Sequence, residues 1–120
     1  MPGRPELSHS ADAVRADDTI FVAGILPVDA RGRLVGEDDV VEQARFVFVE
    51  LERILAAAGC GFEDVVKVTI FMTNIDDRPS INPIRQEMFE AARPASTLVE
   101  VSGLAVPGAL VEVDAVAALP

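Results

Sequence analysis

Two acidic residues near the C-terminus, Glu112 and Asp114, have the type and spacing for acid–base chemistry. They alternate with valines in the segment ALVEVDAV (109–116), so a β-strand there would place both carboxylates on one face. Glu100 has a similar place in STLVEV (96–101), and a neighbouring strand would bring its carboxylate to the same face. Carboxylates held close together raise one another's pKa, which prepares a carboxyl group to exchange protons. The structural alternative is that Glu112 and Glu100 pair with Arg or Lys side chains.

Three other residues have a possible chemical role, and each also has a structural explanation. His9, the only histidine, is either a general base or carboxylate partner with an ordinary pKa of about 6.5, or a surface residue of the N-terminal segment. Gly24 either offers backbone N–H groups to a ligand or simply permits a bulge in a strand. Cys60, the only cysteine, has no second cysteine or nearby histidine to activate it, so we expect an ordinary residue after a helix.

Composition limits the class of protein and its partners. The 120 residues suit one domain, residues 1–120. Twenty acidic residues against ten basic ones give a net charge of −10 without a basic run, which disfavours nucleic acid. The apolar stretches are too short for a membrane helix, the N-terminus has no apolar signal core, and a single cysteine fits a reducing compartment, so we expect a cytoplasmic protein. A mean hydropathy of +0.32 in so small a chain favours self-association.

Hydrophobic periodicity predicts the first half of the fold. Residues 13–24 contain two short apolar runs separated by two aspartates, typical of a hairpin in which 19–23 is the stronger strand. Residues 25–36 are rich in turn formers and should be a loop with a short strand at 33–35. Apolar residues at spacings of three and four predict a helix over 39–58, begun by Asp38 or Asp39 and ended by Gly59.

The second half should supply three more strands and one helix. VVKVTIFM (65–72) is β-branched and almost continuously apolar, as in a buried central strand. A helix should run from near residues 78–80 to Phe89, and Pro83 is tolerable there only in the first turn. Segments 96–101 and 109–116 alternate as strands do. The resulting order, β-β-α-β-α-β-β, predicts an α+β fold with two helices packed on one face of a mixed sheet.

Several longer segments, taken together, resemble the Rid (YjgF-type) family. They are IFVAG followed by Pro27, the helix with Gln43-Ala44 that ends ILAAAG, DVVKVTIFMTN, INPIRQEMF, PASTLVEV and the closing LVEVDAVA. Each segment alone is an ordinary strand or helix sequence. Their order and spacing over nearly the whole chain are specific, so the chain is identified by resemblance as a member of this family.

The resemblance implies a chorismate mutase-like fold and a homotrimer, in which three sheets line a barrel and small-molecule pockets lie between subunits. It also implies hydrolysis of reactive enamines and imines to a carbonyl compound and ammonia, with no metal and no organic cofactor. An imine carbon is already electrophilic, so such a pocket needs mainly to hold the substrate and place a water beside that carbon. A bidentate arginine is the natural group to hold a substrate carboxylate.

The sequence departs from the family pattern in this pocket. The usual P-A-R-S reads Pro94-Ala95-Ser96-Thr97, so Ser96 stands where the resemblance implies the carboxylate-binding arginine. Arg93 is either a replacement for it or, as the structural alternative, a solvated loop arginine, and its place before a proline favours an extended backbone. Ser10 stands where the family has a pocket tyrosine, and His9 lies beside it.

Two features match the family better. Asn82 matches an asparagine at the start of the second helix, and Asp114 has the position of a carboxylate that holds the attacking water, one methylene shorter than the usual glutamate. The resemblance therefore implies Asn82 and Asp114 as catalytic residues. The predicted substrate-binding residues are Ser96, His9, Ser10, Gly24, Ile25, Arg93, Leu98 and Glu112.

Two functions of different classes remain open. One is a deaminating hydrolase whose substrate range is altered by Ser96, and the other is a trimer that binds a small molecule without turnover. A positive group within hydrogen-bond reach of Asn82 and Asp114 would favour turnover of an acid, whereas a pocket of Ser96, Leu98 and apolar residues would favour binding. A ribonuclease or translation inhibitor, names often attached to this family, is disfavoured by the negative charge and the absence of Trp and Tyr.

Overall fold

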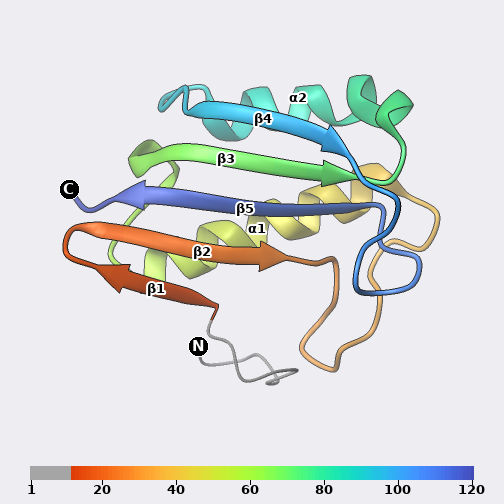
Figure 1. Ribbon diagram of the computed structural model, residues 1–120, viewed down its shortest axis with the longest axis horizontal. Helices are drawn as coiled ribbons and strands as arrows, with labels where there is room; N and C mark the ends of the chain where they lie inside the picture. Colours follow the sequence, from red (N-terminus) through yellow and green to blue (C-terminus); the bar gives the residue numbers. More distant parts are fainter. Residues whose placement is uncertain (1–11) are drawn as a thin grey trace.

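A five-stranded mixed sheet is the base of the fold, and its strands are the segments in which apolar residues alternate or run together. The computed structural model describes residues 12–120. The strand order is β1-β2-β5-β3-β4, and only the β3–β4 pair is parallel (Figure 1). The strands are β1 (Ala13–Ala16), β2 (Thr19–Ile25), β3 (Val65–Met72), β4 (Ala95–Glu100) and β5 (Val111–Ala118).

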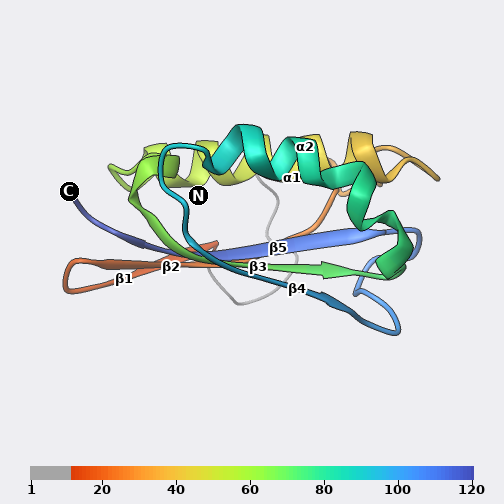
Figure 2. The same cartoon turned by 90° about the horizontal axis from the view of Figure 1, so that it is seen from above.

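Two helices cover one face of this sheet, and no other element of residues 12–120 covers the opposite face (Figure 2). Helix α1 spans Val40–Ala57, and α2 spans Arg78–Phe89, with the short 3-10 turns η1 (Phe62–Asp64) and η2 (Ile75–Asp77) before β3 and α2. The predicted fold class and element order are therefore confirmed. Neither helix of residues 12–120 is long and apolar enough to cross a membrane.

Local chemistry sets the ends of α1 as the sequence indicates. Asp39 is the residue that caps the helix, since its side chain accepts a hydrogen bond from the Glu42 N–H at 3.0 Å. Asp38 instead has a φ of +58°, which turns the chain into the helix. Gly59 has a φ of +85°, a left-handed conformation that costs glycine nothing and ends the helix.

The prediction for Pro83 was wrong. Helix α2 begins at Arg78 as expected, but Pro83 is its sixth residue and lies beyond the first turn. A proline there removes the hydrogen bond to the carbonyl of Pro79, four residues earlier. Both prolines are exposed, so water can satisfy that carbonyl and the helix continues.

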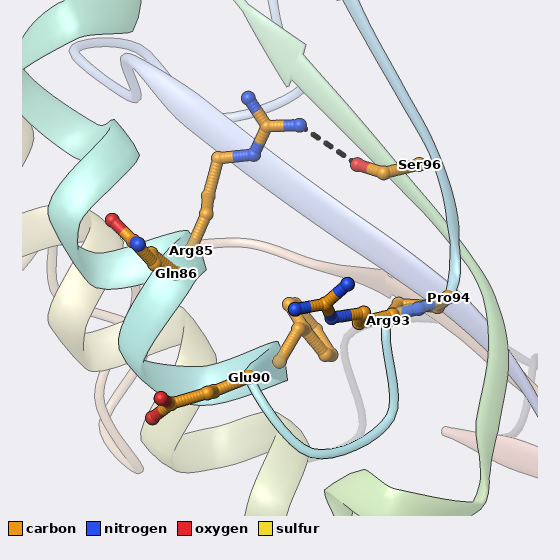
Figure 3. Close-up of a pocket in the computed structure, with 7 residues that line it drawn as sticks. Arg85, Gln86, Glu90, Arg93, Pro94 and Ser96 are labelled. Atoms are coloured by element: carbon orange, nitrogen blue, oxygen red, sulfur yellow. Dashed lines mark hydrogen bonds between the residues drawn. The ribbon is translucent and has the colours of Figure 1, made fainter.

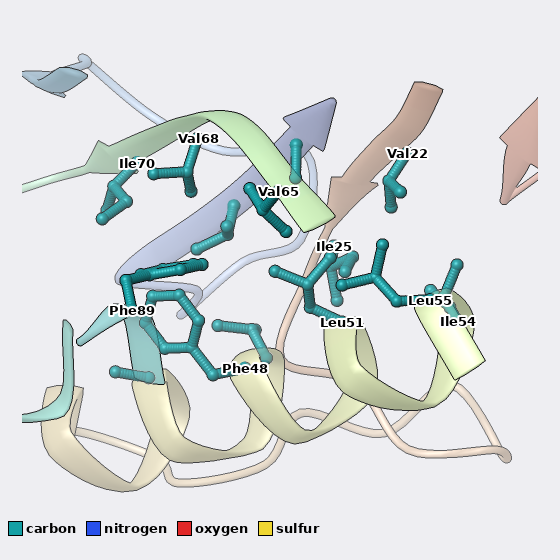
Figure 4. Close-up of a cluster of buried hydrophobic side chains, with 14 of the residues drawn as sticks. Val22, Ile25, Phe48, Leu51, Ile54, Leu55, Val65, Val68, Ile70 and Phe89 are labelled. Atoms are coloured by element: carbon teal, nitrogen blue, oxygen red, sulfur yellow. The ribbon is translucent and has the colours of Figure 1, made fainter. Parts of the chain in front are cut away.

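The core lies between the sheet and the helices and fixes where α2 sits. Phe48 of α1 and Phe89 at the end of α2 meet edge to face with ring centres 5.6 Å apart, and Phe62 meets Phe89 at 5.4 Å. Figure 4 shows the rings of Phe48 and Phe89 beneath β3, next to the aliphatic side chains of α1. Because aromatic pairs favour this geometry, Phe89 anchors the C-terminal end of α2 against α1 and the sheet.

A buried glutamine joins the two long loops to α1. Gln43 is fully buried, and its amide nitrogen donates to the carbonyls of Gly36 and Gly108 at 3.0 Å each. Its side-chain oxygen accepts the Leu110 N–H at 2.7 Å. Every polar atom of the side chain is thus used, and the chain is fixed immediately before β5.

The loop after β2 contains only a trace of the short strand predicted at 33–35. Leu34 forms an isolated bridge with Val28, and no longer ladder follows. The Asp29 side chain accepts the N–H groups of Arg31 and Arg33 at 2.9 and 3.0 Å, which lowers the pKa of that carboxyl. These bonds close a compact turn of the kind that aspartate favours.

Candidate functional site

A pocket lies between α2 and the N-terminal end of β4, and Arg85 is its central side chain (Figure 3). The guanidinium of Arg85 donates to Oδ1 of Asn82 at 2.9 Å and to Oγ of Ser96 at 2.8 Å. The pocket has a volume of about 350 Å³. We call it the edge pocket; its lining residues are Arg85, Gln86, Phe89, Glu90, Arg93, Pro94 and Ser96.

Secondary structure brings these groups together. Asn82 and Arg85 are three residues apart and therefore neighbours on the surface of α2, while Ile84 is turned into the core. In the parallel β3–β4 pair, Ser96 lies opposite the buried Val68, so its side chain shares the face of the sheet that the helices cover. The edge pocket is thus on the helix side of the sheet.

Arg85 carries a positive charge without an acidic partner. Within residues 12–120 its guanidinium makes no ion pair, and the two hydrogen-bond acceptors, an amide and a hydroxyl, are neutral. The side chain is half-buried, and this burial lowers the pKa of Arg85, with the positive charge of Arg78 lowering it further. A cation that is partly removed from water and oriented by neutral groups is a favourable place for an anion.

Arg93 also lines the edge pocket, in a backbone conformation that the sequence did not indicate. Its φ is +49°, left-handed rather than the extended conformation favoured before Pro94. The reason is the end of α2, where the Arg93 N–H donates to the Phe89 carbonyl at 2.9 Å and closes the last turn.

The carboxylates predicted on β5 lie on the other face of the sheet, which we call the open face. Val111, Val113 and Ala115 are buried under the helices, so the alternating Glu112 and Asp114 project from the opposite side. Asp114 pairs with Thr69 of β3 in the register of the strands, and Glu112 pairs with Phe71. Both acids are half-buried.

Gly24 and Glu112 are in direct contact on the open face. The β2–β5 ladder passes from Val22 opposite Ala115 to Ile25 opposite Val113, so a bulge places Gly24 beside β5. A Cβ at Gly24 would overlap the carboxylate oxygen Oε2 of Glu112. Burial raises the pKa of Glu112, and the nearby charge of Asp114 raises it further. Of the two acids, Glu112 therefore has the environment that favours a protonated carboxyl group.

The expectation that Glu100 joins these carboxylates was wrong. Strand β3 separates β4 from β5, and Glu100 lies opposite the buried Met72, on the helix side of the sheet. Its carboxylate accepts the Ile75 N–H at 2.9 Å at the start of η2. Glu100 thus has a structural role that only the order of the strands reveals.

The predicted site residues consequently fall into two groups. Asn82, Ser96 and Arg93 gather at the edge pocket, whereas Gly24, Glu112 and Asp114 gather on the open face. Leu98 lies opposite the buried Ile70 and packs against the core, and Ile25 is only 1% exposed, so its side chain belongs to the core. His9 and Ser10 lie outside the described residues. No group of three metal-ligating side chains occurs within residues 12–120.

Arg85 is the residue that sequence reasoning missed. The signal was present, because an arginine three residues after Asn82 must lie on the same helix surface. The family pattern instead places the carboxylate-binding arginine on the next strand, at the position of Ser96.

Comparison with known proteins agrees with this architecture. The family model described as Endoribonuclease L-PSP matches residues 3–119. The 3-aminoacrylate deaminase RutC of Acinetobacter baylyi is 38% identical over 113 residues, covering 94% of this chain and 89% of RutC. The 2-iminobutanoate/2-iminopropanoate deaminase of Capra hircus is 37% identical, covering 89% of this chain and 77% of that protein.

A solved structure gives the same result. YyfA of Yersinia pestis, described as a member of the conserved Rid protein family, has a TM-score of 0.90 at 32% identity and covers 98% of this chain and 94% of its own. A two-helix layer on a five-stranded mixed sheet is thus a fold that this chain shares with YyfA. The chain belongs to the Rid family, whose model carries the name Endoribonuclease L-PSP.

Proposed function

We propose that this protein hydrolyses a reactive imine or enamine that carries a carboxylate, releasing ammonia and a carbonyl compound. The observation that carries the proposal is Arg85, a half-buried cation whose guanidinium is oriented by Asn82 and Ser96 and has no acidic partner within residues 12–120. Relatives with 37% and 38% identity are named as deaminases of small enamine and imine acids. Arg85 would thus supply the charge that Ser96 does not.

Hydrolysis of an imine requires one water and two proton transfers. Water adds to the imine carbon, forming a C–O bond while one water proton passes to the nitrogen. The remaining hydroxyl proton then passes to the nitrogen, the C–N bond breaks, and ammonia leaves as the carbonyl forms. An enamine first takes a proton at carbon and gives up one from nitrogen to become the imine. A carboxyl group with a raised pKa is suited to donate a proton at neutral pH, and a neighbouring carboxylate is suited to orient water. We assign the first role to Glu112 and the second to Asp114.

A second copy of the chain would complete the site. Asn82 and Arg85 lie on the helix side of the sheet, and Glu112 and Asp114 on the open face, so one protomer does not bring them together. We propose that the β4 edge of one copy lies against the open face of the next in a homotrimer. Apolar exposure supports this arrangement, since Phe21 is 48% and Val66 51% exposed in the single chain.

The test is ammonia release from freshly generated imines of alanine and 2-aminobutanoate, coupled to a nicotinamide-linked assay. We expect turnover by the wild type and a roughly 10- to 100-fold lower kcat/KM for Arg85→Gln, because a hydrogen-bonded charge contributes about 1.5–3 kcal/mol. Arg45→Gln is the matched control, since it removes an exposed arginine of α1 whose partner Glu87 is 3.8 Å away. This control should behave as the wild type.

Absence of ammonia release above the uncatalysed rate, in a folded wild type, would overturn the proposal and favour a trimer that only binds a small molecule. In that case, a saturable ligand-induced shift in melting temperature that Arg85→Gln abolishes would locate the binding site in the edge pocket. Equal activity of Arg85→Gln and the wild type would show instead that the carboxylate is held elsewhere.

A further inference from the structure

The edge pocket contains a second arginine that the proposed reaction of a simple imino acid leaves unused. On the basis of the proposed function, we propose that Arg93 is a second anion-binding group. The pocket would then select imines or enamines with two carboxylates. Arg85 would hold the carboxylate next to the reacting carbon, and Arg93 would hold the carboxylate at the far end. Arg93 is then a specificity-determining residue.

The distribution of charge is the first observation. The chain has ten basic residues against twenty acidic ones, yet two of the ten line one pocket and neither makes an ion pair within residues 12–120. Glu90 also lines the pocket, but Figure 3 shows its carboxylate directed away from both guanidinium groups. Two cations that line one cavity, with its acidic side chain directed away from them, indicate a ligand that brings its own negative charges.

The backbone of Arg93 is the second, independent observation. A φ of +49° is less favourable than a right-handed conformation for a residue with a side chain, a cost that glycine avoids. The position closes the last turn of α2, where glycine is the usual choice. An arginine at this position makes the folded protein less stable than a glycine would, and its side chain lies in the pocket. Backbone strain of this kind is typical of functional sites.

The arrangement and size of the pocket fit a short dicarboxylate. In Figure 3, Arg85 enters from α2 and reaches toward β4, whereas Arg93 enters from the connection that follows α2. A volume of about 350 Å³ lies at the lower end of small-molecule pockets, roughly 300–1,000 Å³, and leaves room beyond a three-carbon acid. A monocarboxylate would neutralise one arginine and leave the like charge of the other in the pocket, whereas a dianion would neutralise both.

The kinetic test compares imines that differ by one carboxylate. Amino acid oxidases generate them in place from aspartate and glutamate, which give dicarboxylates, and from alanine and 2-aminobutanoate, which give monocarboxylates. We expect the wild type to have a kcat/KM for the dicarboxylates about 10- to 100-fold higher, the contribution of one charge-assisted hydrogen bond. Arg93→Gln should lower the dicarboxylate value far more than the monocarboxylate value, and Arg93→Lys should restore part of the ratio.

Two further variants separate selectivity from structure. Arg93→Gly should lose the ratio as Arg93→Gln does while raising the melting temperature, because it relieves the left-handed backbone. Arg31→Gln, an exposed arginine of the loop after β2, is the charge-matched control and should keep the ratio. Equal kcat/KM for both classes in the wild type, or a ratio unchanged in Arg93→Gln, would overturn the proposal and leave the deaminase function standing.

Binding of stable acids measures the preference for two carboxylates without turnover. By calorimetry, succinate should bind the wild type at least about ten times more tightly than propanoate, and Arg93→Gln should remove that difference. If no imine is hydrolysed yet succinate binds through Arg93, the proposed reaction fails and dianion recognition survives. If succinate binds no better than propanoate while imines are hydrolysed, dianion recognition fails alone.

Discussion

The edge pocket and the open face differ in charge, in the elements that build them and in what each lacks. The edge pocket has two arginines and neutral hydrogen-bond partners on α2 and β4, but no carboxylate that faces the guanidinium groups. The open face has two carboxylates on β5 and a glycine contact on β2, amid exposed apolar side chains.

The difference indicates that the two surfaces have complementary roles, substrate binding at the edge pocket and proton exchange on the open face. The arginines of the edge pocket can hold an anionic substrate but cannot exchange protons, because arginine stays protonated. A pair of half-buried carboxylates can exchange protons but repels an anion. Each surface therefore supplies what the other lacks, which is the reason to expect that they meet across two copies.

The largest expected effect that tests this comparison comes from mixing two impaired variants, assayed at a substrate concentration well below KM. Glu112→Gln should lose about 10²- to 10⁴-fold in kcat, the usual contribution of an acid–base group, and Arg85→Gln should lose the roughly 10- to 100-fold in kcat/KM given above. If each site takes Arg85 from one copy and Glu112 from the next, co-refolding the two variants at equal ratio should restore about a quarter of wild-type activity. Unmixed refolded variants are the control.

No recovery in verified mixed oligomers would mean that one copy supplies both residues, against the separation of the two surfaces.

A smaller effect is expected at the contact between Gly24 and Glu112. Gly24→Ala should lower kcat about 10-fold, because the new methyl group overlaps the Glu112 carboxylate and displaces it from its working position. Stability should change little, since the displaced atoms are the end of a flexible side chain. Gly103→Ala is the matched control, because a Cβ there meets nothing within 4 Å. Unchanged kinetics of Gly24→Ala, measured with denaturation midpoints of both variants, would argue against a role for Glu112.

The smallest expected effect is on stability as a function of pH. The folded state raises the pKa of Glu112 above an unfolded value of about 4.3, so the folded protein binds the proton of this carboxyl group more tightly than the unfolded chain does. The protonated carboxyl group therefore contributes to the free energy of unfolding fully below the unfolded pKa. This contribution is lost as pH rises through the folded pKa. Glu112→Gln should therefore melt at a higher temperature than the wild type at pH 7 and at nearly the same temperature at pH 3.5. Asp114→Asn, which removes the neighbouring charge, should give part of the same gain. A lower melting temperature of Glu112→Gln at pH 7 would contradict the sign of the shift.

Periodicity was sufficient for the elements of this fold. The stripe of apolar residues from Ala44 to Leu55 has one helical interpretation, and the run from Val65 to Met72 one strand interpretation. The family, too, was recognisable from the order of short segments. Local prediction failed at Pro83 and Arg93. Pro83 is tolerated inside α2 because it lies on the exposed surface of the helix, and Arg93 is left-handed because its N–H closes the last turn of that helix.

The sequence by itself thus determined the class of fold, the family and the candidate residue types, because these depend on local pattern and composition. Only the tertiary structure decided which of those residues meet. Arg85 reaches Ser96 because the parallel β3–β4 pairing brings β4 alongside α2, and Glu100 is kept from Glu112 because β3 lies between their strands. Asn82 and Asp114 lie on opposite sides of the sheet because α2 packs on one face, and Asp114 alternates along β5 with the residues buried on that face. Which face the helices cover is set by contacts between residues far apart in the chain.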